Sequence, residues 1–333
     1  MAQLSYRESI AAALAYEMTR DERVVLFGED TAAAGGVFKT TEGLLAKFGP
    51  RRVKDMPISE LAILGAAMGM AMTGLRPVAE IMFSDFLACC WDYVANEIPK
   101  ARYMSNGQIT LPLVIRTLNG AGARFGAQHS QSVENWAMAV PGIKVVAPSN
   151  AADAKGLLLA AIRDPDPVIF FEHKYLLSSK CNVPDGEHLV PLGQAAVLRE
   201  GSDVTIIALA AMVPKALQAA DTLAAEHGIE ATVVDVRTLV PLDLQTLLRQ
   251  AKRTGRVFTV EENPRLCGWG AEIASIIQEQ AFSALKQPIV RITTPHVPIP
   301  ATDQLEDAVV PSAAGIVAEI GRALEAHSSK PRK

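Results

Sequence analysis

The chain has 333 residues, of which 49% are hydrophobic and 20% charged, a composition that predicts about two folded domains and excludes an intrinsically disordered protein. A net charge of -4 at pH 7, with no long Lys/Arg run before the short basic tail at 330–333, argues against nucleic acid and anionic membranes as partners. The longest uncharged run, Leu61–Leu75, is shorter than the roughly 20 residues that a membrane-spanning helix requires.

Alternating strands and helices are predicted from the first residues onward. Ser5 and Glu8 have capping-box spacing and begin a helix that extends to about Met18, and Arg23–Gly28 follows as a buried strand. Further strands are predicted near Val53 and at Pro77–Phe83, Leu113–Thr117, Ile143–Ala147 and Val168–Phe171. Helices are predicted at Glu60–Thr73, Asp85–Tyr103, Gln131–Ala139 and Asn150–Arg163.

The same alternation continues in the second half. In residues 176–192 the hydrophobic residues follow neither a helical nor a strand period, so we expect a linker there between domains at 1–175 and 193–333. Beyond it, strands are predicted at Asp203–Leu209, Ala231–Val236, Arg256–Glu261 and Ile289–Ile292, and helices near Pro214–Glu226, Leu244–Lys252, Ala271–Leu285 and Ala313–Ala326. The predicted fold class is α/β, with two doubly wound domains.

The cysteines and the N-terminus bear on the compartment. The four cysteines have no CxxC spacing, so they indicate neither a zinc site nor a disulfide framework, and a reducing compartment fits them. The first 16 residues lack the regions of a signal peptide and are poor in arginine, unlike a transit peptide. The sequence therefore predicts a cytoplasmic protein.

Glu60 stands at the start of a long apolar helix. An acid there is favoured by the helix dipole alone, and the alternative is a carboxylate that shares a proton with a ring nitrogen of a ligand. Gly65 and Gly69 within this helix predict the close approach of another backbone, such as that of a neighbouring subunit.

Other polar residues follow predicted strands, where ligands of open α/β sheets bind. The loop Glu29–Val37 either lines a site or is an ordinary turn. His129, in the loop NGAGARFGAQHSQ, either moves protons or is a polar loop residue, and His173 is more simply explained as structural. The loop glycines give GxGxxxG rather than the dinucleotide-binding GxGxxG. A non-catalytic nucleotide- or flavin-binding subunit is an alternative that the fold class alone does not exclude.

Several segments together resemble the beta subunits of 2-oxo acid and acetoin dehydrogenases, which are transketolase-like enzymes that use thiamine diphosphate. The segments are GED at 28–30, PISELAILGAAMGMAMTGLRPVAEIMF from Pro57, AQHSQS from Ala127, PGIKVVAPSNAADAKGLLLAAIRDPDPVIFFEHK from Pro141, and later VVDVRTLVPLD and PHVPIP. The resemblance covers nearly the whole chain. It implies a pyrimidine-binding domain followed by a transketolase C-terminal domain.

The resemblance also implies roles for individual residues. Glu60 would bond a nitrogen of the coenzyme's pyrimidine ring, and Phe86 would stack on that ring. Glu29 would lie near the ring or in a proton network that links two sites. His129 would lie near the thiazolium and take part in acyl transfer to a lipoyl arm.

Partners, ions and substrate follow from the same resemblance. The GDG…NN signature that holds Mg2+ and the diphosphate is absent, because in this family the alpha subunit of an α2β2 heterotetramer carries it. A lipoyl-bearing acyltransferase would accept the product. The segments FFEHK and AQHSQS favour acetoin as substrate, with pyruvate or branched-chain 2-oxo acids as alternatives. Some relatives hold a potassium ion at positions that match Leu113, Ala161, Ile162, Asp164 and Asp166. The last of these is an amide in some relatives, so Asp166 is a departure.

Overall fold

The computed structural model describes residues 1–328, and the chain divides into two compact units. The first unit comprises residues 1–123, 128–192 and 238–241, and the second comprises 124–127, 193–237 and the residues from Leu242 onward. Within residues 1–328, no helix is both long and apolar enough to cross a bilayer.

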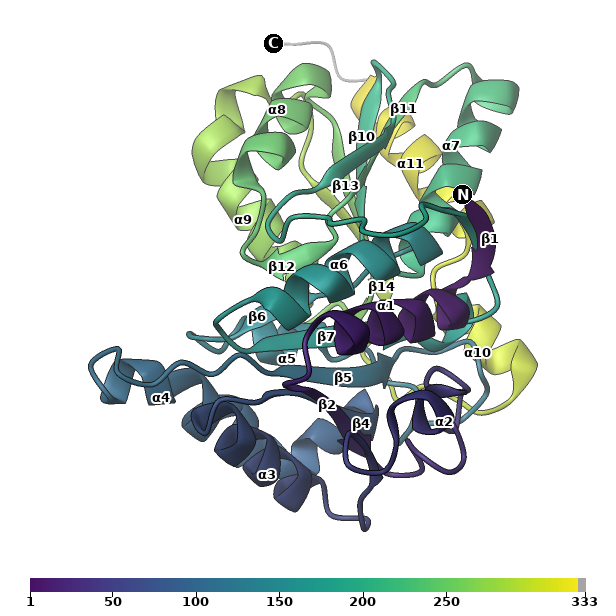
Figure 1. Cartoon of the computed structure of the whole chain (residues 1–333). Helices are drawn as coiled ribbons and strands as arrows, with labels where there is room; N and C mark the ends of the chain where they lie inside the picture. The colour runs from purple at the N-terminus through teal and green to yellow at the C-terminus, as the bar shows by residue number, and fades with distance from the viewer. Residues whose placement is uncertain (329–333) are drawn as a thin grey trace. The chain divides into compact units, whose positions relative to one another are not determined.

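A seven-stranded sheet forms the core of the first unit (Figure 1), in the order β12-β6-β7-β5-β4-β2-β3. Its strands are β2 (Val24–Gly28), β3 (Val53–Asp55), β4 (Arg76–Phe83), β5 (Val114–Asn119), β6 (Lys144–Val146), β7 (Val168–His173) and β12 (Thr238–Val240). All pairings are parallel except that of β12 with β6. The carboxyl ends of β2, β4, β5 and β7 therefore meet at one edge of the sheet.

Helices cover both faces of this sheet. They are α1 (Tyr6–Arg20), α2 (Leu44–Phe48), α3 (Glu60–Met72), α4 (Ile98–Met104), α5 (Glu134–Met138) and α6 (Ala151–Arg163). Figure 1 shows α1 and α6 side by side on one face and α3, which packs against β4, on the other. The predicted capping box at α1 is confirmed, because the Ser5 N–H donates to Glu8 at 2.6 Å and the Ser5 hydroxyl accepts from the Glu8 N–H.

The predicted helix over Asp85–Tyr103 is helical throughout, but it is not one regular α-helix. The segment begins as a 3-10 helix, η1 (Ser84–Cys90), passes through a π-helical turn, η2 (Tyr93–Glu97), and ends as α4. Pro99 explains the π-helical turn, because it has no N–H to donate to Ala95 and its ring would clash with that carbonyl in a regular α-helix. The Ala95 carbonyl accepts a hydrogen bond from the Lys100 ammonium instead.

Besides β12, two short strands of the first unit do not appear among the sequence predictions. β1 (Ala2–Ser5) pairs antiparallel with β8 (Lys180–Val183), which lies inside the segment 176–192. Strands of four residues at an edge carry too few positions for an alternating pattern to be recognised.

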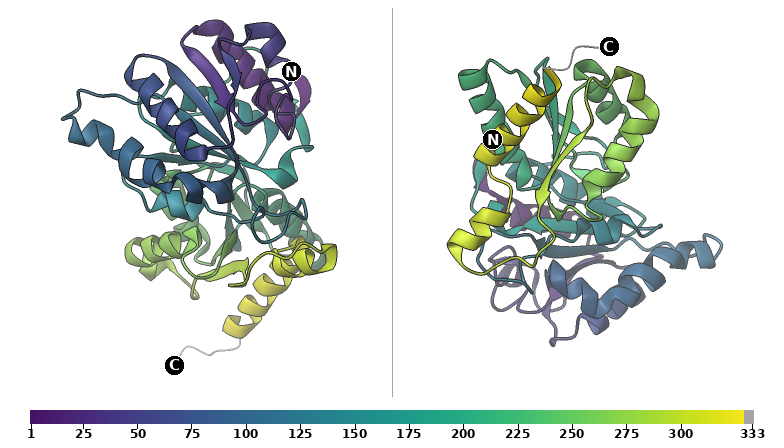
Figure 2. Two further views of the ribbon diagram at one scale, coloured as in Figure 1. Left: turned by 90° about the horizontal axis from the view of Figure 1, so that it is seen from below. Right: turned by 180° about the vertical axis from the view of Figure 1, so that it is seen from behind.

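The second unit has a five-stranded sheet in the order β14-β13-β10-β11-β9. Its strands are β9 (Ala196–Arg199), β10 (Val204–Ala208), β11 (Ala231–Asp235), β13 (Val257–Pro264) and β14 (Val290–Thr294), and only β9 is antiparallel to its neighbour among them. Its helices are α7 (Met212–His227), α8 (Leu244–Thr254), α9 (Trp269–Ala281), α10 (Asp303–Val309) and α11 (Ala313–Ser328). The view from behind shows α11, which packs against α7 (Figure 2). The sequence predicted every long element here and missed β9 and α10.

Candidate functional site

Two acids lie close together at the carboxyl edge of the seven-stranded sheet. Glu29 follows β2, and Glu60 is the first residue of α3. Burial raises the pKa of Glu29, and the negative charge of Glu60 raises it further. Glu29 is 8% exposed, and its Oε1 has no hydrogen-bond partner among the residues that the structure describes. A buried carboxylate with an unused oxygen beside a second acid is a place where a ligand could share a proton.

Three rings form a cluster at the same edge. Phe83 ends β4 and Phe86 lies in η1, and their ring centroids are 5.5 Å apart. The His129 imidazole is 4.7 Å from the Phe83 ring and 5.2 Å from the Phe86 ring, both in edge-to-face geometry. The two phenyl rings therefore restrict the orientation of the imidazole.

Hydrogen bonds close the loop that carries His129. The Gly120 N–H donates to the Gln131 carbonyl at 2.9 Å, which forms the neck of the loop. Asn119 Oδ1 accepts from the Ser84 hydroxyl at 2.8 Å and from the Val133 N–H at 3.1 Å.

A further contact ties this loop to η1. Asp85 Oδ1 accepts from Gln131 Nε2 at 2.8 Å. The structure thus brings Phe86 and His129 together through Asn119, Asp85 and Gln131, which the sequence did not identify. Their one sequence signal is that Asn119 and Asp85 lie just past the carboxyl ends of two predicted strands.

His173 ends β7 beside Asn119 in the register. Its Nδ1 accepts from the Tyr175 N–H at 3.3 Å and so caps the following turn. This contact agrees with the structural role that the sequence favoured.

The glycines of α3 differ in their surroundings. A Cβ at Gly65 would lie 2.8 Å from the Tyr93 hydroxyl, so the close approach there is that of a side chain of the same chain and not of another backbone. A Cβ at Gly69 would meet nothing within 4 Å. Leu61 and Met72, each 48% exposed, lie on the same stripe of the helix as Gly69. The exposed face of α3, defined by Leu61, Gly69 and Met72, is apolar.

The five positions of the predicted potassium site gather at the opposite, amino-terminal edge of the sheet. The Leu113 carbonyl accepts from the Val168 N–H at 3.0 Å, and the Ala161 carbonyl accepts from the Asp164 N–H at 3.3 Å. The Ile162 carbonyl accepts from Arg76 Nη1 at 2.8 Å.

The two acids of this set are paired with cations of the protein. Lys144 Nζ donates to Asp164 at 2.6 Å and lies 3.5 Å from Asp166, which also accepts from Arg102. A bound ion would therefore fit through the second lone pairs of the carbonyl oxygens rather than through free carboxylates.

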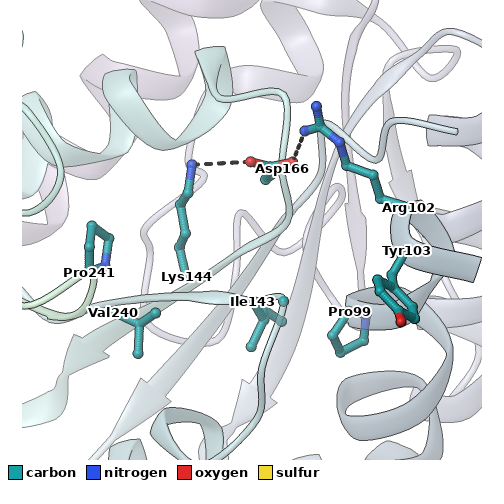
Figure 3. Close-up of a pocket in the computed structure, with 9 residues that line it drawn as sticks. Pro99, Arg102, Tyr103, Ile143, Lys144, Asp166, Val240 and Pro241 are labelled. Atoms are coloured by element: carbon teal, nitrogen blue, oxygen red, sulfur yellow. Dashed lines mark hydrogen bonds and ion pairs between the residues drawn. The ribbon is translucent and has the colours of Figure 1, made fainter. Parts of the chain in front are cut away.

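A cavity of about 560 Å3 opens beside these acids. It is lined by Pro99, Arg102, Tyr103, Gly142, Ile143, Lys144, Asp166, Val240 and Pro241. Figure 3 shows Asp166 between the side chains of Lys144 and Arg102. Because β6 and β7 begin at this edge, the cavity is distinct from the site of Glu29, Glu60 and His129.

Comparisons with known proteins agree with this arrangement. Residues 2–180 match the family described as "Transketolase, pyrimidine binding domain", and residues 193–316 match "Transketolase, C-terminal domain". The beta subunit of acetoin:2,6-dichlorophenolindophenol oxidoreductase from Cupriavidus necator is 46% identical over 326 residues, which cover 95% of this chain and 96% of the relative. The pyruvate dehydrogenase E1 component subunit beta of Rickettsia felis is 43% identical, with coverage of 95% and 96%.

Solved structures show the same fold. A split-gene transketolase described as an inactive beta4 tetramer superposes with a TM-score of 0.80 at 28% identity, over 97% of this chain and 99% of that chain. A transketolase from Pichia stipitis has a TM-score of 0.70 at 15% identity and covers 99% of this chain with 47% of its own length, a likeness of fold alone. The chain therefore belongs to the transketolase-like family of beta subunits of thiamine-diphosphate-dependent acetoin and 2-oxo acid dehydrogenases.

Proposed function

We propose that this chain is the beta subunit of an acetoin dehydrogenase component, which cleaves acetoin and passes the acyl group to a lipoyl arm. The observation that carries the proposal is the joint placement of the Glu29–Glu60 pair and the His129 cluster at one sheet edge. Pyruvate is the alternative substrate, since acetoin and pyruvate relatives differ by only a few per cent in identity. Branched-chain 2-oxo acids are a further alternative.

Thiamine diphosphate, when bound, supplies the carbon nucleophile and the electron sink of the reaction. The residues of this chain orient it and handle protons. Glu60 would share a proton with the pyrimidine nitrogen, and the unused Oε1 of buried Glu29 would extend that proton network. Phe86 would hold the pyrimidine ring. His129 would exchange a proton through its imidazole during acyl transfer.

A partner must complete the site. The chain lacks GDG…NN, so Mg2+ and the diphosphate would be held by an alpha subunit in an α2β2 heterotetramer. The exposed apolar face of α3 supports such an assembly, because contact with a partner would remove this apolar surface from water. We place the complex in the cytoplasm, although plant relatives bear mitochondrial names. A coloured purified protein would instead support the flavin-binding alternative.

The principal test replaces Glu60 with glutamine in the assembled complex. Glu60→Gln keeps the size of the side chain but cannot share an acidic proton, so proton exchange at the thiazolium carbon should slow by about 100-fold or more. NMR of the bound coenzyme measures this exchange. Glu279→Gln, which changes an exposed acid of α9, is the control. Unchanged exchange in Glu60→Gln would contradict the proposal.

His129→Ala tests the transfer step. We expect reductive acylation of a lipoyl domain to fall by about 100-fold, with proton exchange at the thiazolium carbon unaffected. Assays with acetoin, pyruvate and branched 2-oxo acids, on the complex with its alpha subunit, then identify the substrate. Higher kcat/KM for pyruvate would replace the acetoin assignment.

A potassium ion at Leu113, Ala161, Ile162, Asp164 and Asp166 is a separate proposal. It is supported by the gathering of these positions at one sheet edge. Binding predicts a higher midpoint of thermal unfolding in potassium than in tetramethylammonium buffer of equal ionic strength. Equal midpoints would indicate that no potassium ion binds and that Lys144 and Arg76 alone stabilise these positions.

A further inference from the structure

The cavity at the amino-terminal edge of the first sheet has walls from separate parts of the chain. Pro99, Arg102 and Tyr103 lie on one side of α4, because residues three and four apart share a helix face. Lys144 begins β6, and Val240 ends β12, the strand that pairs with β6. All the lining residues belong to the first unit. The volume of about 560 Å3 is in the range of small-molecule sites.

A close backbone contact holds two of these walls together. Gly142 has a φ of +102°, a conformation that favours glycine, and a Cβ there would overlap the Pro99 carbonyl. Helix α4 therefore packs directly on the segment that leads into β6. In Figure 3, Pro99, Ile143 and Val240 lie below the dashed ion pairs and form an apolar floor.

The wall above this floor is ionic. Lys144 Nζ donates to both oxygens of Asp164, at 2.6 and 2.7 Å, and lies 3.5 Å from Asp166. Arg102 donates to Asp166 through Nη1. Within residues 1–328, Asp166 is the only acceptor of the Arg102 side chain. The edge of the guanidinium that carries Nε and Nη2 therefore has no protein acceptor in this part of the chain.

The two walls together define the chemistry of a ligand. Two N–H groups on one guanidinium edge match the two oxygens of a carboxylate, and the floor matches an apolar body. A phosphate would bring a second negative charge beside Asp166 and would leave the floor in water. A cation would be repelled by Arg102 and Lys144. The ligand that fits both walls is a small monocarboxylate with a branched or aromatic body.

We propose that this cavity is a second ligand site of the chain, which binds a small apolar monocarboxylate through the free edge of Arg102. The carboxylate would be held by the guanidinium, and the apolar body would cover the floor, so both parts contribute to the affinity. The site lies at the edge of the sheet opposite to Glu29 and Glu60. The inference is therefore independent of the proposed function.

The experiment titrates 4-methylpentanoate into the full chain and measures binding by calorimetry. We expect saturable binding with a Kd of roughly 1 mM, because the compound has only about eight non-hydrogen atoms. The amide 4-methylpentanamide has the same shape without the charge and should bind about tenfold more weakly or worse. Acetate has the charge without the apolar body and should also bind about tenfold more weakly or worse.

Two variants locate the compound in the cavity. Arg102→Gln removes the guanidinium from a half-exposed position and should raise the Kd for 4-methylpentanoate by about tenfold or more. Val240→Phe fills the cavity from β12 with Arg102 in place and should raise the Kd by a similar factor. Arg322→Gln removes an arginine of α11 that pairs only with Glu319 among its described contacts, and it should leave the Kd unchanged.

Circular dichroism checks the fold of each variant, and Arg102→Gln alone decides the outcome if Val240→Phe does not fold. The proposal is overturned by the absence of saturable binding, by equal affinity for the acid and the amide, or by a wild-type Kd in folded Arg102→Gln or Val240→Phe. Proton exchange in Glu60→Gln tests the other edge of the sheet, so either proposal can fail without the other.

Discussion

Glu29 is the residue at the candidate site whose ionisation the protein alters most clearly. Burial, and then the charge of Glu60, raises its pKa above the ordinary value of 4.5. Folding thus favours the neutral acid, so the stability that Glu29 contributes is complete below pH 4.5 and is lost as the pH rises through the folded-state pKa. Glu29→Gln cannot ionise, and its stability relative to the wild type should therefore be greater at pH 8 than at pH 4.

The measurement is the midpoint of thermal unfolding for Glu29→Gln and the wild type at several pH values. Glu279→Gln, on the exposed surface, should give a difference that does not vary over the same range. If the difference in midpoint between Glu29→Gln and the wild type is constant from pH 4 to pH 8, the pKa of Glu29 is not raised by folding.

Residues at the site differ in how visible they are in the sequence. Glu60 can be recognised because it precedes a long apolar run, and His129 because glycines surround it. Asn119, Asp85 and Gln131 act through partners distant in sequence, as in the 46-residue separation of Asp85 and Gln131. No local pattern encodes such contacts, because register and loop closure create them.

A buried ion cluster joins three neighbouring strands at the centre of the first sheet. Arg116 on β5 donates to Glu172 on β7 at 2.6 Å and to Glu80 on β4 at 2.9 Å. All three side chains are at most 3% exposed, and burial raises the pKa of Glu172. Arg116→Met would leave two buried carboxylates without a cation and should destabilise the fold by about 3–5 kcal/mol.

Replacing the whole cluster provides the control. The variant Arg116→Met with Glu80→Leu and Glu172→Leu removes every buried charge, so it should recover most of the stability lost in the single variant. Denaturant unfolding compares the three proteins. If the triple variant is as unstable as Arg116→Met, the loss of stability does not come from the unpaired carboxylates, and the hydrogen bonds or packing of the cluster stabilise the fold.

Elements with strong local patterns were predictable and the others were not. Buried strands such as β2 and β7 are continuous apolar runs, and both lie where the sequence places them. The segment Ser84–Met104 has a helical pattern too and is helical, but Pro99 imposes a π-helical turn that the pattern does not predict. The short strands β1, β8, β9 and β12 depend on pairing partners far away in sequence, which periodicity does not report.

At the scale of the whole molecule, the beta-subunit relatives and the exposed apolar face of α3 both fit an assembly with a partner chain. Leu61, Gly69 and Met72 follow a spacing of eight and three residues, which places them along one stripe. If this stripe contacts the alpha subunit, a charge there would be desolvated on assembly. Met72→Lys should therefore weaken association by about tenfold or more while the chain itself stays folded.

Analytical ultracentrifugation of the mixed subunits measures this association, and circular dichroism checks the fold of the variant alone. Glu279→Lys places the same cationic side chain at an exposed position of α9, away from α3 in sequence, and is expected to assemble normally. Because the variant changes no residue of the Glu29–Glu60 pair or the His129 cluster, activity should return when subunit concentrations are raised above the weakened Kd. Full assembly of Met72→Lys at wild-type concentrations would place the partner on a different face of the chain.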